Sequence, residues 1–310
     1  MAAVPGGARK RARAVGDVVQ TLHALPFVSV IVPTYNGAGT LDAQLAALYA
    51  QRYAGPWEVI VVDNRSTDAT VQIVGEWLDR MPNLRLVPAY ERQGRGYALN
   101  CGARAARGEI FLFCDCDDVA GEGWVAAMAE ALCAHAVVVG LTEIERLNQR
   151  RPGAIKPYNS ASHVSLDFLP HATGCNSGVT REAFEAVGGF EERSQRAQDI
   201  DFSWRLQLAG YKIFDAPDAV LHYRYREGLR SVWRQTVHNA IAHAWLYRRF
   251  RSQGMPRSSW RAALRDYLWL VRYARILPVR PYEFRVAWVY RAGLRWGRLL
   301  GSLIYRVWYP

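Results

Sequence analysis

Long uninterrupted apolar segments are missing from this sequence of 310 residues. Even the apolar run from Ala136 to Leu141 is flanked by His135 on one side and Glu143 on the other. A helix that crosses a bilayer needs about 18 to 20 consecutive apolar residues. The sequence therefore disfavours an integral membrane protein.

Cysteine is scarce as well. The five cysteines are odd in number, and they lack the paired spacing of a disulfide framework or a zinc site. Residues 1–24 are basic, but no apolar core of a secretory signal follows them. We therefore expect residues 1–24 to form a basic flexible tail and the protein to be cytoplasmic.

Lysine is nearly absent, and acidic residues are rare in the last third of the chain. Three lysines stand against 36 arginines, a skew that we attribute to genomic base composition. The formal net charge is +11, but residues 14–222 hold 17 basic and 25 acidic side chains. Residues 223–310 hold 18 arginines and three acidic residues. This division indicates two roles, with the basic part meeting an anionic or interfacial partner.

Strand-like and helix-like patterns alternate over the first half of the chain. Each of four short apolar runs is followed by a loop and an amphipathic pattern, and the runs are residues 27–33, 57–63, 84–88 and 109–114. Because these runs are apolar throughout, they indicate parallel strands covered on both faces. We predict an α/β fold with an open, mostly parallel sheet, helices on both faces and a ligand beyond the carboxyl ends of the strands.

The pattern changes to amphipathic helices after residue 225. Residues 229–250 carry apolar side chains at helical spacing, and residues 260–276 and 283–309 combine tryptophan and tyrosine with arginine. We therefore predict a basic, aromatic helical extension over residues 226–310. Such helices suit the headgroup layer of a membrane. Packing on the α/β domain and dimerisation are alternatives, and nucleic-acid binding is not expected because no recognised reader motif is present.

An acidic turn follows the fourth strand-like run. Asp115, Asp117 and Asp118 come directly after it. Carboxylates one residue apart in a turn can meet a hard divalent ion, one directly and one through water, and such an ion can hold a nucleotide diphosphate. Solvation and helix capping are the alternative. The strand context favours the cation, because three acids at one strand end repel each other.

Five ordered motifs resemble those of a known family. They are VSVIVPTYN (28–36), VVDNRSTD (61–68), ALNCGARAARG (98–108), DCDD (115–118), and GGFEE with QDIDFSWR (188–192 and 198–205). In order and spacing this series resembles family 2 glycosyltransferases of the GT-A fold. The resemblance implies a GT-A catalytic domain over residues 25–225. It also implies inverting sugar transfer from a nucleotide-diphosphate donor with a divalent cation, Mn²⁺ or Mg²⁺.

The resemblance assigns donor binding to residues that follow the strands. These residues are Pro33, Thr34, Tyr35, Asn36, Asp63, Asn64, Arg95, Asp115 and Cys116. Tyr35 is expected against the base, and Asp63 or Asn64 at its edge. The family often has two acids there, so Asn64 leaves the base open. Arg95 is expected near the phosphates, with a solvated loop charge as the alternative.

The metal ligands that the resemblance implies are Asp117, Asp115 and His222. Asp117 is the stronger candidate of the two aspartates. His222 follows an apolar, strand-like segment, and a structural histidine is the alternative interpretation of it.

The acceptor side rests on the last of the five motifs. Asp199 matches the family's general base, which takes the proton of the acceptor hydroxyl. Gln198 stands where the family usually has an acid, which removes one negative charge beside Asp199. Asn176, Asp201 and Arg205 complete the predicted acceptor side, although Asp201 could instead cap its helix or pair with Arg205.

Together these patterns predict an inverting glycosyltransferase that is peripheral on the cytosolic face of a membrane. The expected acceptor is a glycolipid, a lipid-linked sugar or a cell-envelope glycan. The alternatives are a glycosyltransferase of small natural products and a catalytically silent membrane-bound scaffold. A nucleotidylyltransferase needs a Gly-rich basic loop after the first strand, and a dinucleotide oxidoreductase needs G-x-G-x-x-G; neither is present. A dimer is possible.

Overall fold

The computed structural model describes residues 25–148, 162–194, 196–225 and 228–310. The expected tail over residues 1–24 lies outside this part of the chain. The strands are β1 (Val28–Thr34), β2 (Trp57–Asp63), β3 (Leu84–Pro88), β4 (Ile110–Cys114), β5 (Val119–Ala120), β6 (Val137–Glu143), β7 (Ser162–Ser165), β8 (Leu169–Ala172), β9 (Asn176–Thr180) and β10 (Ile213–His222).

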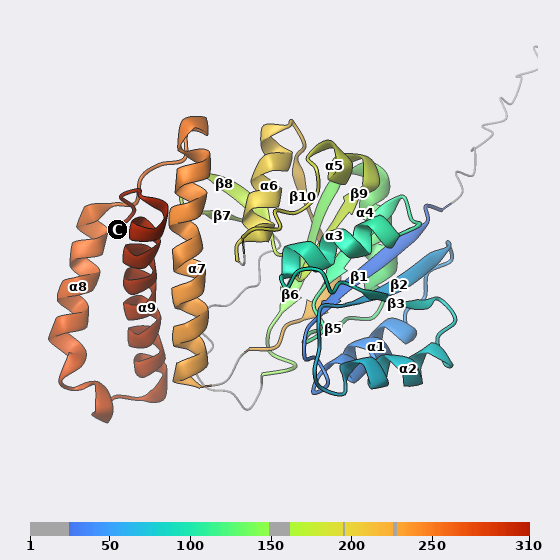
Figure 1. The fold of residues 1–310 in the computed structure, drawn as a ribbon, viewed down its shortest axis with the longest axis horizontal. Coiled ribbons are helices and arrows are strands. Elements are labelled where there is room, and N and C mark those ends of the chain that lie inside the picture. The colour runs from blue at the N-terminus through green and yellow to red at the C-terminus, as the bar shows by residue number, and fades with distance from the viewer. Residues whose placement is uncertain (1–24, 149–161, 195, 226–227) are drawn as a thin grey trace, which may run out of the picture.

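Eight of these strands form one sheet, in the order β3-β2-β1-β4-β9-β6-β10-β5 (Figure 1). The pairs β1–β2, β1–β4, β2–β3 and β6–β10 are parallel. β9 lies antiparallel between β4 and β6, and β5 pairs antiparallel with β10. The mostly parallel sheet and its four predicted strands are therefore confirmed, and β9 is an unpredicted reversed strand at its centre.

Helices cover the sheet on both faces, as predicted. The helices are α1 (Leu41–Tyr49), α2 (Thr70–Leu78), α3 (Arg95–Ala105), α4 (Trp124–Ala134), α5 (Arg181–Ala186), α6 (Gln198–Leu208), α7 (Leu229–Phe250), η1 (Arg251–Gln253), α8 (Trp260–Ala274), η2 (Leu277–Val279) and α9 (Tyr282–Tyr305). One buried cluster joins α1, α2 and α4 to one face, and a second joins α3, α5 and α6 to the other.

Alternation along β1 shows why the strand sequences are apolar throughout. Val30 and Val32 belong to the first buried cluster, and Ile31 between them belongs to the second. Successive side chains of a strand point to opposite faces, so a sheet covered on both faces needs an apolar residue at every position. A glycine brings α3 close to this sheet, because a Cβ on Gly102 would lie 2.5 Å from Cγ2 of Ile31.

The three C-terminal helices lie beyond β10, on the side away from β3 (Figure 1). α9 packs against both α7 and α8. Glycines at positions 293, 297 and 301 of α9 face α7, and a Cβ on Gly297 would lie 2.4 Å from the backbone oxygen of Val237. The helix predicted over residues 229–250 is confirmed, and the two later helices end at residues 274 and 305.

The extension also packs on the α/β part of the chain. Trp204 of α6 meets Phe250 of α7 edge-on, with ring centroids 5.2 Å apart. Tyr309, four residues after the end of α9, stacks on Tyr247 of α7 with ring centroids 5.1 Å apart. The domain boundary after residue 225 stays a prediction. Within the described residues, no helix combines the length and the apolar character that crossing a bilayer requires.

Candidate active site

The loops after β1 and β2 are tied together where the two strands end. The backbone N–H of Asn36 donates to Oγ of Ser66 at 2.9 Å, and the N–H of Thr67 donates to Oδ1 of Asn36 at 2.8 Å. Pro33 and Thr34 are buried at the end of β1, whereas Tyr35 is half exposed. This edge therefore presents an exposed ring on a fixed loop, as a nucleoside pocket requires.

Asp63 and Asn64 have different surroundings at the end of β2. Asp63 is buried and accepts a hydrogen bond from the N–H of Ser66 at 3.2 Å. Its carboxylate raises the pKa of the Tyr90 hydroxyl, with burial adding to the effect.

The Asn64 amide is engaged by the loop that precedes α3. Its Nδ2 donates to the carbonyl oxygens of Ala89 and Arg92, and its Oδ1 accepts from the N–H of Gly94 at 2.7 Å. A carboxylate can only accept, so an acid could not make the first two bonds. Base reading by Asn64 stays a prediction, and the structure gives this residue a role in placing the loop.

The acidic turn after β4 brings three carboxylates together. Asp115, Asp117 and Asp118 each offer an oxygen, and these oxygens all lie within 4.8 Å of one another. Asp118 is 1% exposed, and its Oδ2 has no hydrogen-bond partner. Burial raises the pKa of Asp118, and the neighbouring carboxylates of Asp117 and Asp115 raise it further. A divalent cation would relieve both the repulsion and the unsatisfied oxygen, so these residues fit such an ion.

Two residues that sequence reasoning missed support this turn. The backbone N–H of Arg224 donates to Oδ1 of Asp118 at 2.9 Å, and its Nε donates to the carbonyl oxygen of Asp117 at 3.0 Å. Gln44 of α1 is fully buried and donates from Nε2 to the carbonyl oxygen of Asp115 at 3.1 Å. The sequence pattern could have identified Gln44, because it is a polar residue within the apolar stripe of Leu41, Leu45 and Leu48. No sequence pattern marks Arg224 as part of the site.

Cys116 lies between the acidic turn and the end of β1. A Cβ on Gly37 would lie 2.9 Å from Cγ2 of Thr34 and 3.2 Å from Sγ of Cys116. Burial, with the charges of Asp117 and Asp115, raises the pKa of Cys116 to about 12. A thiol with so high a pKa is protonated near neutral pH.

Arg95, the first residue of α3, reaches the acidic turn. Its Nη2 lies 2.7 Å from Oδ1 of Asp115 and donates to the carbonyl oxygen of Gly174 at 2.8 Å. Burial opposes the charge of the guanidinium, but the carboxylates of Asp115 and Asp199 outweigh it and raise the pKa of Arg95. The alternative of a solvated loop charge is therefore wrong, because the side chain is paired and mostly covered.

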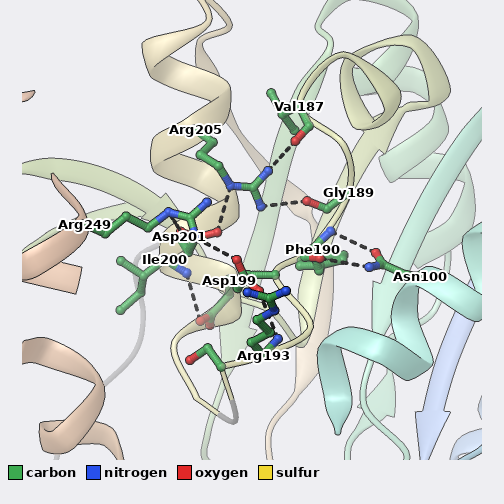
Figure 2. A network of polar contacts seen from close by, with 12 residues as sticks. Asn100, Val187, Gly189, Phe190, Arg193, Asp199, Ile200, Asp201, Arg205 and Arg249 are labelled. Atoms are coloured by element: carbon green, nitrogen blue, oxygen red, sulfur yellow. Dashed lines mark hydrogen bonds and ion pairs between the residues drawn. The ribbon is translucent and has the colours of Figure 1, made fainter. Parts of the chain in front are cut away.

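Gly174 is the point at which the donor-side and acceptor-side motifs meet. A Cβ on this residue would lie 2.9 Å from Nη1 of Arg95 and 3.1 Å from Cβ of Asp199. The N–H of Gly174 donates to Oδ2 of Asp199 at 3.2 Å, and the N–H of Ile200 donates to Oδ1 at 2.9 Å. Asp199 is partly exposed in the first turn of α6 (Figure 2), where the helix dipole favours a negative charge.

Asp201 and Arg205 form an ion pair behind Asp199, which confirms the pairing considered from the sequence. Nε of Arg205 lies 2.8 Å from Oδ2 of Asp201, and the other guanidinium nitrogens donate to the carbonyl oxygens of Val187 and Gly189 (Figure 2). Nε of Arg249, from α7, lies 2.9 Å from Oδ1 of Asp201 without hydrogen-bond alignment. Burial raises the pKa of Asp201, although both arginines oppose the rise.

Asn176 and Gln198 of the predicted acceptor side are placed in the interior. Asn176 has no exposed surface. Its Oδ1 accepts a hydrogen bond from Nε1 of Trp124 at 2.7 Å, and its Nδ2 donates to the carbonyl oxygen of Leu141 at 3.0 Å. Gln198 is buried and donates to the carbonyl oxygen of Ser194 at 2.7 Å. Acceptor contact by Asn176 and Gln198 stays a prediction, and the observed bonds give both amides a structural role.

His222, at the end of β10, has protein partners at both ring nitrogens. Nδ1 lies 2.6 Å from Oε2 of Glu143, and Nε2 lies 3.0 Å from Nη1 of Arg146. The described residues whose ligand atoms cluster are the three aspartates, and His222 is not among them. Metal binding by His222 stays a prediction, and the structural role considered for it has observed contacts.

The fold and the site together define an α/β protein of the GT-A type, with a carboxylate cluster at the carboxyl edge of its sheet. Residues 29–188, just over half of the chain, match the sequence model of glycosyl transferase family 2. The chain therefore belongs to that family.

Known proteins resemble the chain over parts of their length. Glycosyltransferase AglE of Haloferax volcanii is 29% identical over 201 residues, which cover 63% of this chain and 66% of that protein. Validoxylamine A glucosyltransferase of Streptomyces hygroscopicus subsp. jinggangensis is 38% identical over 228 residues, covering 60% and 52%. The chain thus spans less than two thirds of the length of these relatives.

A solved structure resembles the chain over most of its length. The mannosyltransferase PcManGT from Pyrobaculum calidifontis, in complex with GDP-Man and Mn²⁺, has a TM-score of 0.62 and 24% sequence identity. The similarity covers 89% of this chain and 87% of that one. This likeness shows the fold.

Proposed function

We propose that the protein is an inverting glycosyltransferase that moves a sugar from a nucleotide-diphosphate donor to an acceptor hydroxyl. The observation that carries the proposal is the meeting of Arg95 and Asp199 at Gly174, beside the carboxylates of the acidic turn. A cation site, a fixed positive charge and a partly exposed carboxylate in one place suit transfer from a diphosphate. Family membership and the resemblance to a mannosyltransferase solved with GDP-Man and Mn²⁺ support it.

The donor side would hold a divalent cation, Mn²⁺ or Mg²⁺, on Asp115, Asp117 and Asp118. The cation supplies positive charge to the leaving diphosphate. Arg95 supplies a second positive charge from the start of α3, where it is already held by Asp115 and Gly174. The exposed ring of Tyr35 and the buried Asp63 would bind the nucleoside.

The acceptor side would use Asp199 as the general base. Its two oxygens are held by the N–H groups of Gly174 and Ile200, so the carboxylate is oriented before an acceptor arrives. When Asp199 accepts the proton of the acceptor hydroxyl, the hydroxyl oxygen becomes a stronger nucleophile as the new bond forms. One base and a neutralised leaving group suffice for a single displacement, which inverts the anomeric carbon.

We propose a glycolipid, a lipid-linked sugar or a cell-envelope glycan as the acceptor, reached by peripheral attachment to the cytosolic face of a membrane. The 18 arginines and the tryptophans of residues 223–310 support attachment to an anionic surface. A small natural product is the second candidate acceptor, because a relative that is 38% identical is a validoxylamine A glucosyltransferase.

A thermal-shift screen of UDP-, GDP- and dTDP-sugars, with and without Mn²⁺, tests the donor. A ligand that binds the folded state raises the melting temperature, so we expect one donor to do so in a Mn²⁺-dependent way. Mn²⁺-dependent hydrolysis of that donor and NMR of the product's anomeric configuration then test the reaction. If no donor is bound or hydrolysed, the silent-scaffold alternative replaces the proposal.

A further inference from the structure

One side of α8 is exposed and apolar. The residues on this side recur every three or four positions, so they align along one face of the helix. They are Trp260 (62% exposed), Leu264 (49%), Leu268 (63%) and Val271 (76%). We call these four residues the α8 stripe. Large exposed apolar side chains are unremarkable singly, but four in one row mark an interaction surface.

Contacts on the opposite side of α8 fix the orientation of the stripe. Nη2 of Arg295, from α9, lies 2.6 Å from Oδ2 of Asp266, and Nε1 of Trp288 donates to the carbonyl oxygen of Leu270 at 3.1 Å. Ala263 and Leu270 are buried. α8 lies at the outer edge of the molecule, with α9 and α7 between it and the sheet (Figure 1). The stripe therefore points outward from a helix whose rotation is set by α9.

Arginines border the α8 stripe. Arg261, Arg265 and Arg272 are exposed, and helical geometry places them on the side next to the stripe. Asp266, the acidic residue of α8, is instead turned toward α9 and paired with Arg295. The outer face of α8 thus combines an apolar row with a row of positive charge and no carboxylate of its own helix.

The apolar surface continues past the end of α8. Ile276 and Val279 are exposed in the turn that contains η2, and Arg275 and Arg280 are exposed beside them. An interfacial helix has this composition, because apolar side chains enter the headgroup layer while arginines reach lipid phosphates at its edge.

We propose that the outer face of α8 docks on an anionic lipid bilayer, with the α8 stripe entering the headgroup layer and Arg261, Arg265 and Arg272 contacting lipid phosphates. The occupant follows from charge complementarity, since a neutral partner would not require the arginine row. The inference rests on the membrane attachment proposed above and names the surface that makes it. The site at Asp199 and the acidic turn lies on other elements and is not part of this surface.

Co-sedimentation of the full chain with phosphatidylcholine vesicles, and with vesicles that also contain phosphatidylglycerol, tests the proposal. The variant Leu264→Ser/Leu268→Ser/Val271→Ser should bind anionic vesicles at least about tenfold more weakly, because it removes three apolar side chains from the contact. The control Val71→Ser/Leu78→Ser changes exposed apolar residues of α2 and should bind like the wild type.

The arginine row is tested separately. Arg261→Gln/Arg265→Gln/Arg272→Gln should lose the preference for anionic vesicles and most of the salt dependence. The control Arg52→Gln/Arg80→Gln/Arg107→Gln removes the same charge from exposed positions of the α/β part and should keep both.

Three outcomes overturn the inference. Stripe variants that bind vesicles like the wild type would show that another surface docks. A wild-type chain that binds neither type of vesicle would contradict the proposed membrane attachment as well. A wild-type dimer that the stripe variant converts to a monomer, in light scattering, would make a second copy the occupant. Donor hydrolysis should be unchanged in every variant, and its loss in the wild type would instead contradict the proposed reaction.

Discussion

The three aspartates of the acidic turn differ in what surrounds them. Asp115 is paired with Arg95, Asp118 is buried with its Oδ1 on Arg224, and Asp117 is partly exposed. Asp115 and Asp118 therefore contribute to the protein's own structure, and Asp117 is the ligand candidate on which the metal assignment is tested.

Asp117→Asn should abolish metal-dependent donor binding and leave the melting temperature near that of the wild type. A neutral amide is a poor ligand for a hard cation, and the replaced side chain is partly exposed. Calorimetric titration of the donor with and without Mn²⁺ measures the effect, with Glu122→Gln, an exposed acid outside the cluster, as the control. Unchanged Mn²⁺-dependent affinity in Asp117→Asn would disprove its assignment as a ligand.

Asp199→Asn should bind donor normally and lose transfer by roughly 10² to 10⁴-fold, the usual contribution of a positioned general base. The amide keeps the size of the side chain and can still accept one of the two hydrogen bonds from the N–H groups of Gly174 and Ile200, so α6 should still form. Steady-state rates and donor affinity are measured in parallel, with Asp218→Asn, an exposed residue of β10, as the control. Transfer that survives within a few-fold would require another base, and the buried, doubly paired Asp201 is poorly placed to be one.

Asn64→Asp should lower the free energy of unfolding by about 1 to 3 kcal/mol, because two carbonyl oxygens lose their donor and a charge is buried. The carbonyls are those of Ala89 and Arg92 in the loop that leads to Arg95, so donor affinity should fall as well. Urea unfolding measures the stability. Asn83→Asp is the control, since its amide makes one long bond of 3.4 Å to Trp57; equal effects in both variants would contradict the role of Asn64.

At the scale of elements, the sequence predicts what local pattern determines. The four strands β1 to β4 and the helix α7 were predicted closely. A strand covered on both faces is apolar at every position, and a helix covered along one side has apolar residues at helical spacing. β9 was not predicted. Its sequence, NSGVT, has no apolar alternation, and the pattern of residues 173–178 favours a tight turn bracketed by glycines. Its place between β4 and β6 is set by partners far away in the chain.

The contacts of the candidate site could also be predicted only in part from the sequence. The strand-end residues were predictable, because the carboxyl ends of parallel strands share one edge of a sheet. The meeting of Arg95 with Asp199 was not, because it depends on Gly174, at which a side chain would collide with both. Sequence spacing carries no information on such a long-range approach.

Arg249→Met tests how α7 holds α6. The variant should lose about 1 to 3 kcal/mol of stability, less than for a fully buried pair because Arg249 is about one third exposed. Burial already raises the pKa of Asp201, and loss of Arg249 should raise it further. A carboxyl with a higher pKa in the folded state binds more protons there, so stability falls as pH rises through that range. The loss should therefore be larger at neutral than at mildly acidic pH.

Unfolding at several pH values measures this effect. Arg248→Met removes the neighbouring arginine, which is exposed and contacts the carbonyl oxygen of Tyr305 at 3.3 Å, and it should show little change. Because Asp201 is two residues from Asp199, Arg249→Met should also slow transfer while donor affinity is kept. A pH-independent loss would contradict the coupling to Asp201.

At the scale of the whole molecule, the C-terminal end of the chain is connected to the α/β part. α9 packs on α7, and α7 in turn contacts α6. Tyr309 is 2% exposed and belongs to the same buried cluster as Trp204 of α6 and Phe250 of α7. The helix α6, which carries Asp199, is therefore linked to the last residues of the described chain through α7. A C-terminal extension that only attached the protein to a surface would not need this buried connection.

A chain truncated after Gly254 should be less stable than the full chain, with a melting temperature lower by several degrees. The truncation removes the α9 glycines that pack on Ala240 and Ala244 and exposes the ring of Tyr247. Several kcal/mol lost from a total of about 5 to 15 is a large fraction of the stability of a domain. Scanning calorimetry and dye binding to exposed apolar surface measure the change, with the α8 stripe variant as the control, because it alters the same extension while keeping α9. If the truncated chain unfolds at the temperature of the full chain, then α7 does not require α9, and the extension is an independent module.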